Sequence, residues 1–161
     1  MGLDMFLYGV KKNEVGLDEP SEGVWKEVCY WRKANQIHKW FSTRYIKDQD
    51  PWGMYEVTHH ALQGLLALCI FLKRQKDNKE NEIIKDKSFE MYQTLAQEFG
   101  VEDGDFADYI ASVLLPPDNL GCFFGSGFVD EDYWFDIDDT IEMLKKALSE
   151  KYDAFYYRAS W

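Results

Sequence analysis

Cysteine and long apolar runs are scarce in this chain of 161 residues, and each shortage excludes a class of protein. The three cysteines are odd in number, widely spaced and set in apolar runs, which is typical of buried free thiols in a reducing compartment. The longest apolar run, residues 61–72, is too short to span a bilayer, and the N-terminal residues lack the basic start of a secretory signal. We therefore expect a soluble, cytoplasmic protein that does not cross a membrane.

Positive charge is missing from a long part of the sequence. The net charge is −11, and residues 88–144 contain fourteen acidic residues but no Lys or Arg. Residues 1–76 instead carry eleven Lys and Arg against nine Asp and Glu. An acidic surface repels the phosphates of nucleic acid, so we expect no direct nucleic acid binding. The acidic part is either a solubilising surface or a mimic of a phosphate backbone that attracts a basic protein.

What the sequence does contain is enough apolar material for one globular domain, with 46% hydrophobic and 17% aromatic residues. Alternating apolar and β-branched residues predict strands at residues 1–9, 24–30, 121–128 and 154–158. Helical periodicity predicts helices that begin at Trp31 and near residues 58, 89, 106 and 136. The order predicts a single α+β domain over residues 1–161, in which four to five helices pack on a small, mainly antiparallel sheet. Residues 73–87 are expected to form a charged, exposed link.

The most unusual segment is residues 30–41, YWRKANQIHKWF, which combines aromatic, cationic and amide side chains. A stripe at helical spacing, which includes Ala34, Ile37 and Phe41, is explained by packing in a core. The remaining side chains suit a flat anionic ligand, because rings stack on it and guanidinium groups bind phosphate. The candidate ligand-binding residues are Arg32, Lys33, Asn35, Gln36, His38, Lys39 and Trp40. The alternative is a core helix in which Arg32 pairs with a neighbouring acid.

A second candidate surface is the acidic run that begins at Asp130. A calcium loop is excluded, because Trp134 and Phe135 occupy its fifth and sixth positions, where a ligand and a glycine are needed. These acids are expected at a helix N-terminus, which favours negative charge. The candidate partner-binding residues are Asp130, Glu131, Asp132 and Asp136.

The sequence contains no pattern that is typical of catalysis or of a metal site. The adjacent His59 and His60 point about 100° apart on a helix and cannot easily bind one metal ion. No serine or cysteine lies in a nucleophile motif, and GCFFGSG lacks the spacing of a phosphate-binding loop. We therefore predict no catalytic residue, no metal and no cofactor, and the sequence favours a binding protein over an enzyme.

Three segments form a recognisable set: GLDMFLYG near the start, YWRKANQIHKWF in the centre, and LLPPDNLGCFFGSGFVDEDYW with YYRASW towards the end. Together they resemble a family of small uncharacterised proteins encoded by phages, prophages and bacteria. The resemblance spans nearly the whole chain, although residues 73–87 look less typical of the family. It implies a compact single-domain cytoplasmic protein, often from a mobile element, and it transfers no activity and no catalytic residue.

These features lead us to expect a non-enzymatic binding protein of the phage or prophage type, with counter-defence as one setting. It would sequester a host protein or a small anionic, nucleotide-like ligand. One alternative is an acidic nucleic-acid mimic that inhibits a basic host protein. The other is a hydrolase or nuclease-like enzyme that uses His38 together with an acid.

Overall fold

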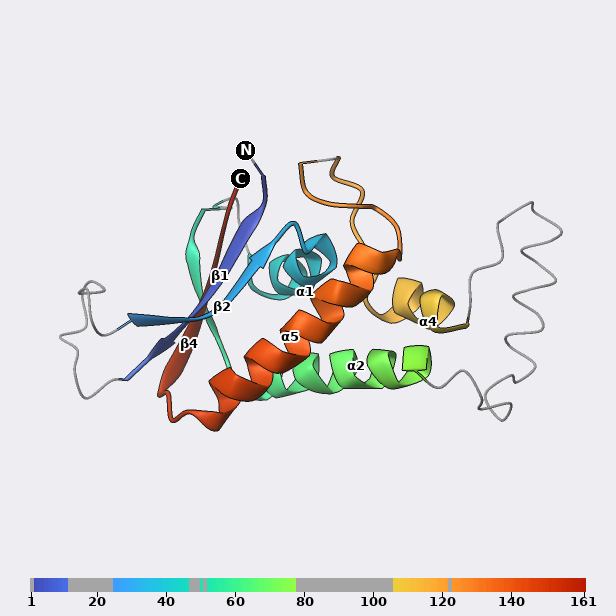
Figure 1. Ribbon diagram of the computed structural model, residues 1–161. Helices are drawn as coiled ribbons and strands as arrows, with labels where there is room; N and C mark the ends of the chain where they lie inside the picture. The colour runs from blue at the N-terminus through green and yellow to red at the C-terminus, as the bar shows by residue number, and fades with distance from the viewer. Residues whose placement is uncertain (1, 12–24, 47–49, 51, 78–105, 122) are drawn as a thin grey trace, which may run out of the picture.

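The computed structural model describes residues 2–11, 25–46, 50, 52–77, 106–121 and 123–161. Its four strands are β1 (Asp4–Val10), β2 (Trp25–Arg32), β3 (Met54–Val57) and β4 (Ala154–Ser160). They form one antiparallel sheet in the order β2-β1-β4-β3. The helices of the described part are α1 (Asn35–Tyr45), α2 (His59–Asp77), α4 (Phe106–Leu114) and α5 (Glu131–Ser149). All four helices lie on the same side of the sheet, which confirms the predicted single α+β domain (Figure 1).

The core lies between the sheet and the helices. Strand residues alternate between the two faces, so that Met5 and Leu7 of β1 and Phe155 and Tyr157 of β4 point inward and are buried. From the helix side, the ring of Phe41 in α1 stacks on Tyr157 with 4.0 Å between ring centroids. These apolar contacts hold α1 against the middle of the sheet.

Helix α5 runs diagonally across the helical layer and contacts both β2 and α2 (Figure 1). Its apolar stripe includes the buried Ile137, Ile141 and Leu144. Asp130 caps its N-terminus, because its Oδ1 accepts a hydrogen bond from the Tyr133 backbone N–H at 3.0 Å. The cap and the stripe together fix where the acidic first turns of α5 lie.

Several predicted elements differ from the structure. Trp31 and Arg32 belong to β2, because Trp31 pairs with Met5 across the sheet and points into the core. The described residues of the predicted strand at 121–128 form turns instead, with positive φ at Gly121 and Gly125. The short strand β3 was not predicted. Helix α2 includes residues 73–77 of the predicted link; residues 78–87 and the helix predicted from residue 89 lie outside the described part.

Two further expectations concern cysteines and membranes. Cys29 and Cys69 are free and buried, and burial raises the pKa of each thiol to about 12, as expected of inert core thiols. Cys122 lies outside the described residues. Among the helices that the structure describes, none is long and apolar enough to cross a bilayer.

Candidate functional site

A cavity of about 430 Å³ lies where the end of β2 and the start of α1 meet the first turns of α5. We call it the junction cavity. Its lining comprises Arg32, Lys33, Gln36, Gly125, Ser126, Phe128, Asp130, Asp132, Tyr133, Phe135, Asp136 and Asp139. Three predicted ligand-binding residues and three predicted acidic residues therefore lie around one space, although they are far apart in the sequence.

The backbone at this junction has an unusual conformation that brings the two segments together. Lys33 has a left-handed φ of 61°, and its N–H donates to the carbonyl oxygen of Leu3 at 2.8 Å. The loop before α5 approaches closely at Gly125, whose φ is +107°. A Cβ added at Gly125 would overlap the carbonyl oxygen of Lys33, so only glycine fits without displacement. The cavity wall is thus set by backbone geometry.

Asn35 fastens the same loop from the first residue of α1. Its side chain is buried, and its Nδ2 donates to the carbonyl oxygen of Ser126 at 2.8 Å. Its Oδ1 accepts from the backbone N–H of Asp118 at 3.0 Å. Both ends of the amide are used inside the protein, so Asn35 positions the cavity wall and does not line the cavity.

Gln36 and Asp136 connect the cationic and acidic sides of the cavity. The Gln36 Nε2 donates to the Asp136 Oδ2 at 2.9 Å. Burial raises the pKa of Asp136, the hydrogen bond from Gln36 lowers it, and the neighbouring carboxylates of Asp132, Asp139 and Asp130 raise it. Together these effects bring the pKa of Asp136 to about 7. Asp136 therefore changes its charge near neutral pH.

The two cations of the cavity are accessible. Arg32 is exposed, and its Nη1 lies 3.7 Å from the Oδ1 of Asp4, which is a weak surface pair rather than a core ion pair. Lys33 is also exposed and has no ion pair with any residue of the described part. Both side chains line the junction cavity and are accessible to an anionic group there.

The other predicted ligand-binding residues lie away from the cavity. His38 is buried, with its Nδ1 2.8 Å from the Tyr157 hydroxyl, and burial lowers its pKa. Trp40 is buried under Arg44, whose guanidinium carbon lies 4.5 Å from the ring centroid. The Nζ of Lys39 lies 3.9 Å from the Oδ1 of Asp118. These three residues belong to the other sides of α1.

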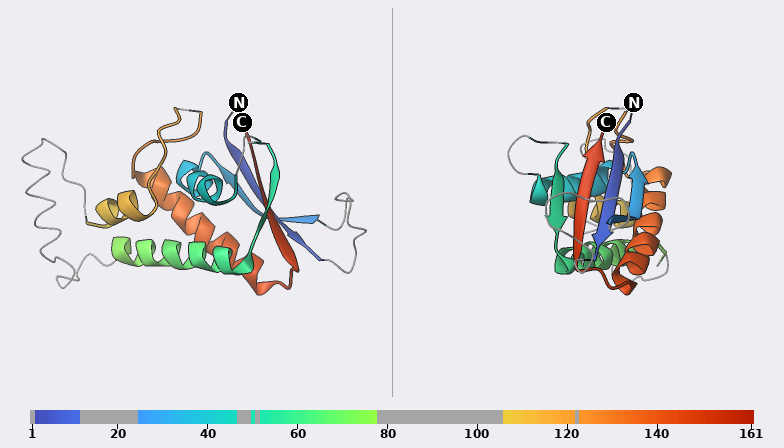
Figure 2. Two further views of the ribbon diagram at one scale, coloured as in Figure 1. Left: turned by 180° about the vertical axis from the view of Figure 1, so that it is seen from behind. Right: turned by 90° about the vertical axis from the view of Figure 1, so that its left-hand side faces the viewer.

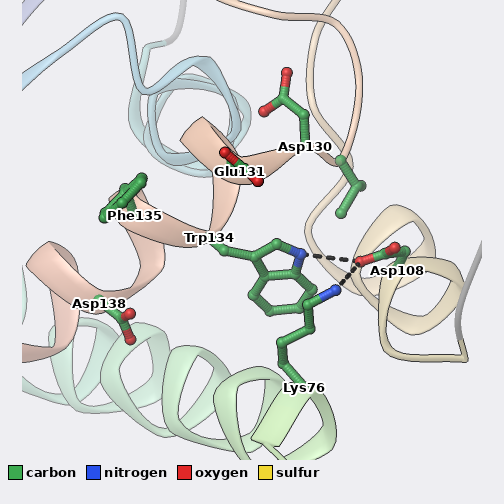
Figure 3. A pocket seen from close by; sticks show the side chains of 8 residues that line it. Lys76, Asp108, Asp130, Glu131, Trp134, Phe135 and Asp138 are labelled. Atoms are coloured by element: carbon green, nitrogen blue, oxygen red, sulfur yellow. Dashed lines mark hydrogen bonds and ion pairs between the residues drawn. The ribbon is translucent and has the colours of Figure 1, made fainter.

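A second cavity, of about 580 Å³, lies between the first turns of α5, the end of α2 and α4 (Figure 3), and it shares Asp130 and Phe135 with the lining of the junction cavity. Glu131, the fourth predicted acidic residue, is part of its lining. In this cavity the Trp134 indole N–H and the Lys76 ammonium both donate to the Oδ1 of Asp108, at 2.9 and 3.1 Å. Its principal polar groups are thus paired with one another, and for this reason we place the candidate site in the junction cavity.

Sequence reasoning missed Asp139, Tyr133 and the loop residues of the junction cavity. Asp132, Asp136 and Asp139 are spaced i, i+4 and i+7, so helical periodicity alone puts them on one face of α5. No comparable signal identifies the loop residues. In the part of the chain that the structure describes, no group of three or more His, Cys, Asp or Glu side chains could hold a metal ion.

Comparison with known proteins does not assign the chain to a family. No protein-family model matches it, and neither a curated protein nor a solved structure matches it. The function therefore has to be argued from the site itself.

Proposed function

We propose that this chain is a non-enzymatic binding protein that sequesters a small ligand in the junction cavity. The observation that carries the proposal is the meeting of Arg32, Lys33 and Gln36 with Asp132, Asp136 and Asp139 around one cavity. Concave sites with a few convergent polar groups and a titratable group of perturbed pKa are typical ligand sites.

The charges around the cavity define the ligand. Two cations stand at the β2–α1 junction, and four carboxyl groups stand at the start of α5. A simple polyanion would be attracted at one side of the cavity and repelled at the other. The site therefore suits a ligand that joins an anionic group, for Arg32 and Lys33, to an amino group, for the carboxylates. Amino acids and amino-bearing nucleotides have this chemistry.

The other readings of the sequence have less support. His38 is buried against Tyr157 and does not line the junction cavity, so nothing places it beside a substrate. Acidic mimicry needs an exposed set of carboxylates: Glu131 and Asp132 are exposed, but Asp136 is hydrogen-bonded to Gln36 and Asp130 caps α5, so the exposed set is small. A role in phage counter-defence would act through sequestration of the ligand, and it rests on the sequence resemblance.

Arg32→Ala tests the proposal. Thermal unfolding of the full chain is measured with a panel of amino acids, amines, and linear and cyclic nucleotides. We expect at least one compound with both an amino and an anionic group to raise the melting temperature. Arg32→Ala should lower the affinity for that compound about tenfold or more, because it removes a charge-assisted hydrogen bond.

Lys39→Ala is the matched control, since it removes a cation from α1 outside the junction cavity. It should bind the same compound as the wild type does. The proposal is wrong if no compound of the panel stabilises the protein, or if Arg32→Ala and Lys39→Ala bind it equally well.

A further inference from the structure

The face of the sheet that points away from the helices carries a group of aromatic side chains. Figure 2 shows this face, with all described helices behind it. Because side chains alternate between the two faces along each strand, five aromatic residues lie on this face. We call them the outer ring cluster: Phe6, Tyr8, Trp25, Tyr30 and Tyr156. All five are at least partly accessible, and Tyr30 is 41% exposed.

The rings of the cluster form a continuous surface across three strands. Ring centroids lie 4.6 Å apart for Trp25 and Tyr156, and 5.3 Å apart for Phe6 and Tyr30. Tyr8 connects these two pairs, at 6.2 Å from Phe6 and 6.4 Å from Trp25. Contiguous exposed apolar surface of this kind marks an interaction site in proteins. Tyrosine and tryptophan are also enriched where proteins meet.

The cluster also contains a donor without an acceptor. The indole N–H of Trp25 is buried and has no hydrogen-bond partner among the residues that the structure describes. Buried donors are nearly always paired, because an unpaired donor loses its hydrogen bonds to water without replacement, at a cost in free energy. An acceptor from a bound partner would remove that cost.

Carboxylates flank the rings. The strand register sets Glu27 beside Tyr8, Tyr8 beside Tyr156, and Tyr156 beside Glu56, so that one row crosses all four strands. Both glutamates are exposed. Burial raises the pKa of Tyr8 and of Tyr156, and the adjacent glutamate of each raises it further. Negative charge therefore acts on these two rings from both ends of the row.

The nearby cations do not reverse this charge. Arg32 has Asp4 beside it, and Arg158 is the other exposed cation among the described residues of the face, in the row that contains Phe6 and Met54. With Asp4, Glu27 and Glu56 against these two cations, the described part of the face is net negative in a chain whose charge is −11. Ring faces and carboxylates together attract cations, and a guanidinium stacks on rings better than an ammonium does.

We propose that the outer ring cluster and its glutamate row dock a basic protein segment that presents arginine side chains. Guanidinium groups stack on Tyr8 and Tyr156 and pair with Glu27 and Glu56. Bases of single-stranded nucleic acid also stack on exposed rings, but their phosphates would meet the glutamates. A second copy would bring a face of the same net sign against this one.

Binding of a short labelled peptide of alternating arginine and glycine to the full chain tests the proposal by fluorescence anisotropy. A lysine–glycine peptide of the same length and a labelled single-stranded oligonucleotide are measured beside it. We expect the arginine peptide to bind more tightly than the lysine peptide, with an affinity that falls as salt rises, and the oligonucleotide not to bind.

Two variants and two controls locate the binding. The double variant Tyr8→Thr with Tyr156→Thr keeps strand-forming residues, and it should bind the arginine peptide with about tenfold lower affinity. The double variant Glu27→Gln with Glu56→Gln should also lower the affinity for the arginine peptide, and that affinity should depend less on salt. Glu142→Gln on α5 and Phe71→Ala on α2, which change exposed residues of the helical side, should have no effect.

The proposal is overturned if the arginine peptide does not bind, or if it binds both double variants as it binds the wild type. Oligonucleotide binding or a dimer that is lost in the tyrosine variant would also overturn it, in favour of another occupant. If the tyrosine variant does not fold, the glutamine variant decides. Tyr8 and Tyr156 do not line the junction cavity, so the tyrosine variant should keep the melting-temperature response to the junction-cavity ligand, and failure of one proposal is distinguishable from failure of the other.

Discussion

Lys33 shows how a single residue bears on both stability and the proposed site. A left-handed backbone costs a non-glycine residue about 1–2 kcal/mol, and glycine at this position would avoid the cost. Lys33 nevertheless has a φ of 61°. Its side chain is a second cation beside Arg32 in the lining of the junction cavity.

Asp136 makes the stability of the protein depend on pH in a defined direction. Its folded pKa, about 7, lies above the ordinary value of an aspartate, about 4. The folded state thus binds the proton more tightly, and the stability that this contributes is complete below about pH 4 and lost as the pH rises through about 7. Asp136→Asn should therefore raise the melting temperature relative to the wild type above pH 7, and the difference should shrink as the pH falls.

Thermal unfolding across this pH range measures the effect. Glu142→Gln removes an exposed carboxylate from the same helix and serves as the control. If Asp136→Asn and the wild type keep a constant difference throughout the range, the titrating group is not Asp136.

At the scale of elements, one buried hydrogen bond joins α5 to the sheet. The Trp31 indole N–H donates to the Thr140 hydroxyl at 2.8 Å, and that hydroxyl donates to the carbonyl oxygen of Asp136 at 2.6 Å. Thr140→Val keeps the shape of the side chain but leaves the indole N–H unpaired. We expect it to lower the free energy of unfolding by about 1–3 kcal/mol, as measured by urea denaturation.

Thr140→Ser keeps the hydroxyl and is the matched variant. It should recover most of the stability, because only a methyl group is removed. Equal losses for the serine and valine variants would mean that packing, and not the hydrogen bond, determines the effect.

Helices and strands could be predicted from the sequence where their apolar period is clear, and not where contacts between strands override it. Helix α4 and strand β4 could be predicted, because each has a clear apolar period and an identifiable end. The apolar stripe of α5 was also predicted, but the helix begins at Glu131, five residues before the predicted start at Asp136, because Asp130 caps it. Trp31 fits the helical stripe that continues through Ala34 and Phe41, yet it lies in β2 because pairing with Met5 overrides that period. The four residues of β3 are too few for a period to be visible.

The candidate site was predictable only in parts. Helical spacing groups Asp132, Asp136 and Asp139, and composition singles out Arg32 and Lys33. That the two groups share a cavity depends on the approach of Gly125 to Lys33, which is a contact between distant segments. Local sequence patterns contain no information on such a contact.

For the whole molecule, the net charge of −11 implies repulsion within the folded state. Sodium chloride should therefore raise the melting temperature, since a Debye length of about 10 Å at 0.1 M screens charges across the surface. Sucrose is the control for solvent effects that do not involve charge.

A decrease of the melting temperature in sodium chloride would also have a clear cause. Lys73 lies 2.8 Å from Asp138, and Lys76 lies 3.1 Å from Asp108. If salt lowers the melting temperature, such pairs stabilise the protein by more than the repulsion destabilises it. Partly exposed pairs of this kind contribute about 0–1 kcal/mol each, so we expect repulsion to dominate.

The position of β4 also has a consequence for biosynthesis. It is the last strand along the sequence, but it lies between β1 and β3 (Figure 1). While the ribosome is still making the chain, one edge of β1 has no neighbour, and β3 lacks the strand that it pairs with among those described. The sheet closes only after residues 154–160 emerge. Until then the nascent chain exposes an unpaired strand edge, the feature by which unfinished proteins aggregate and chaperones recognise them.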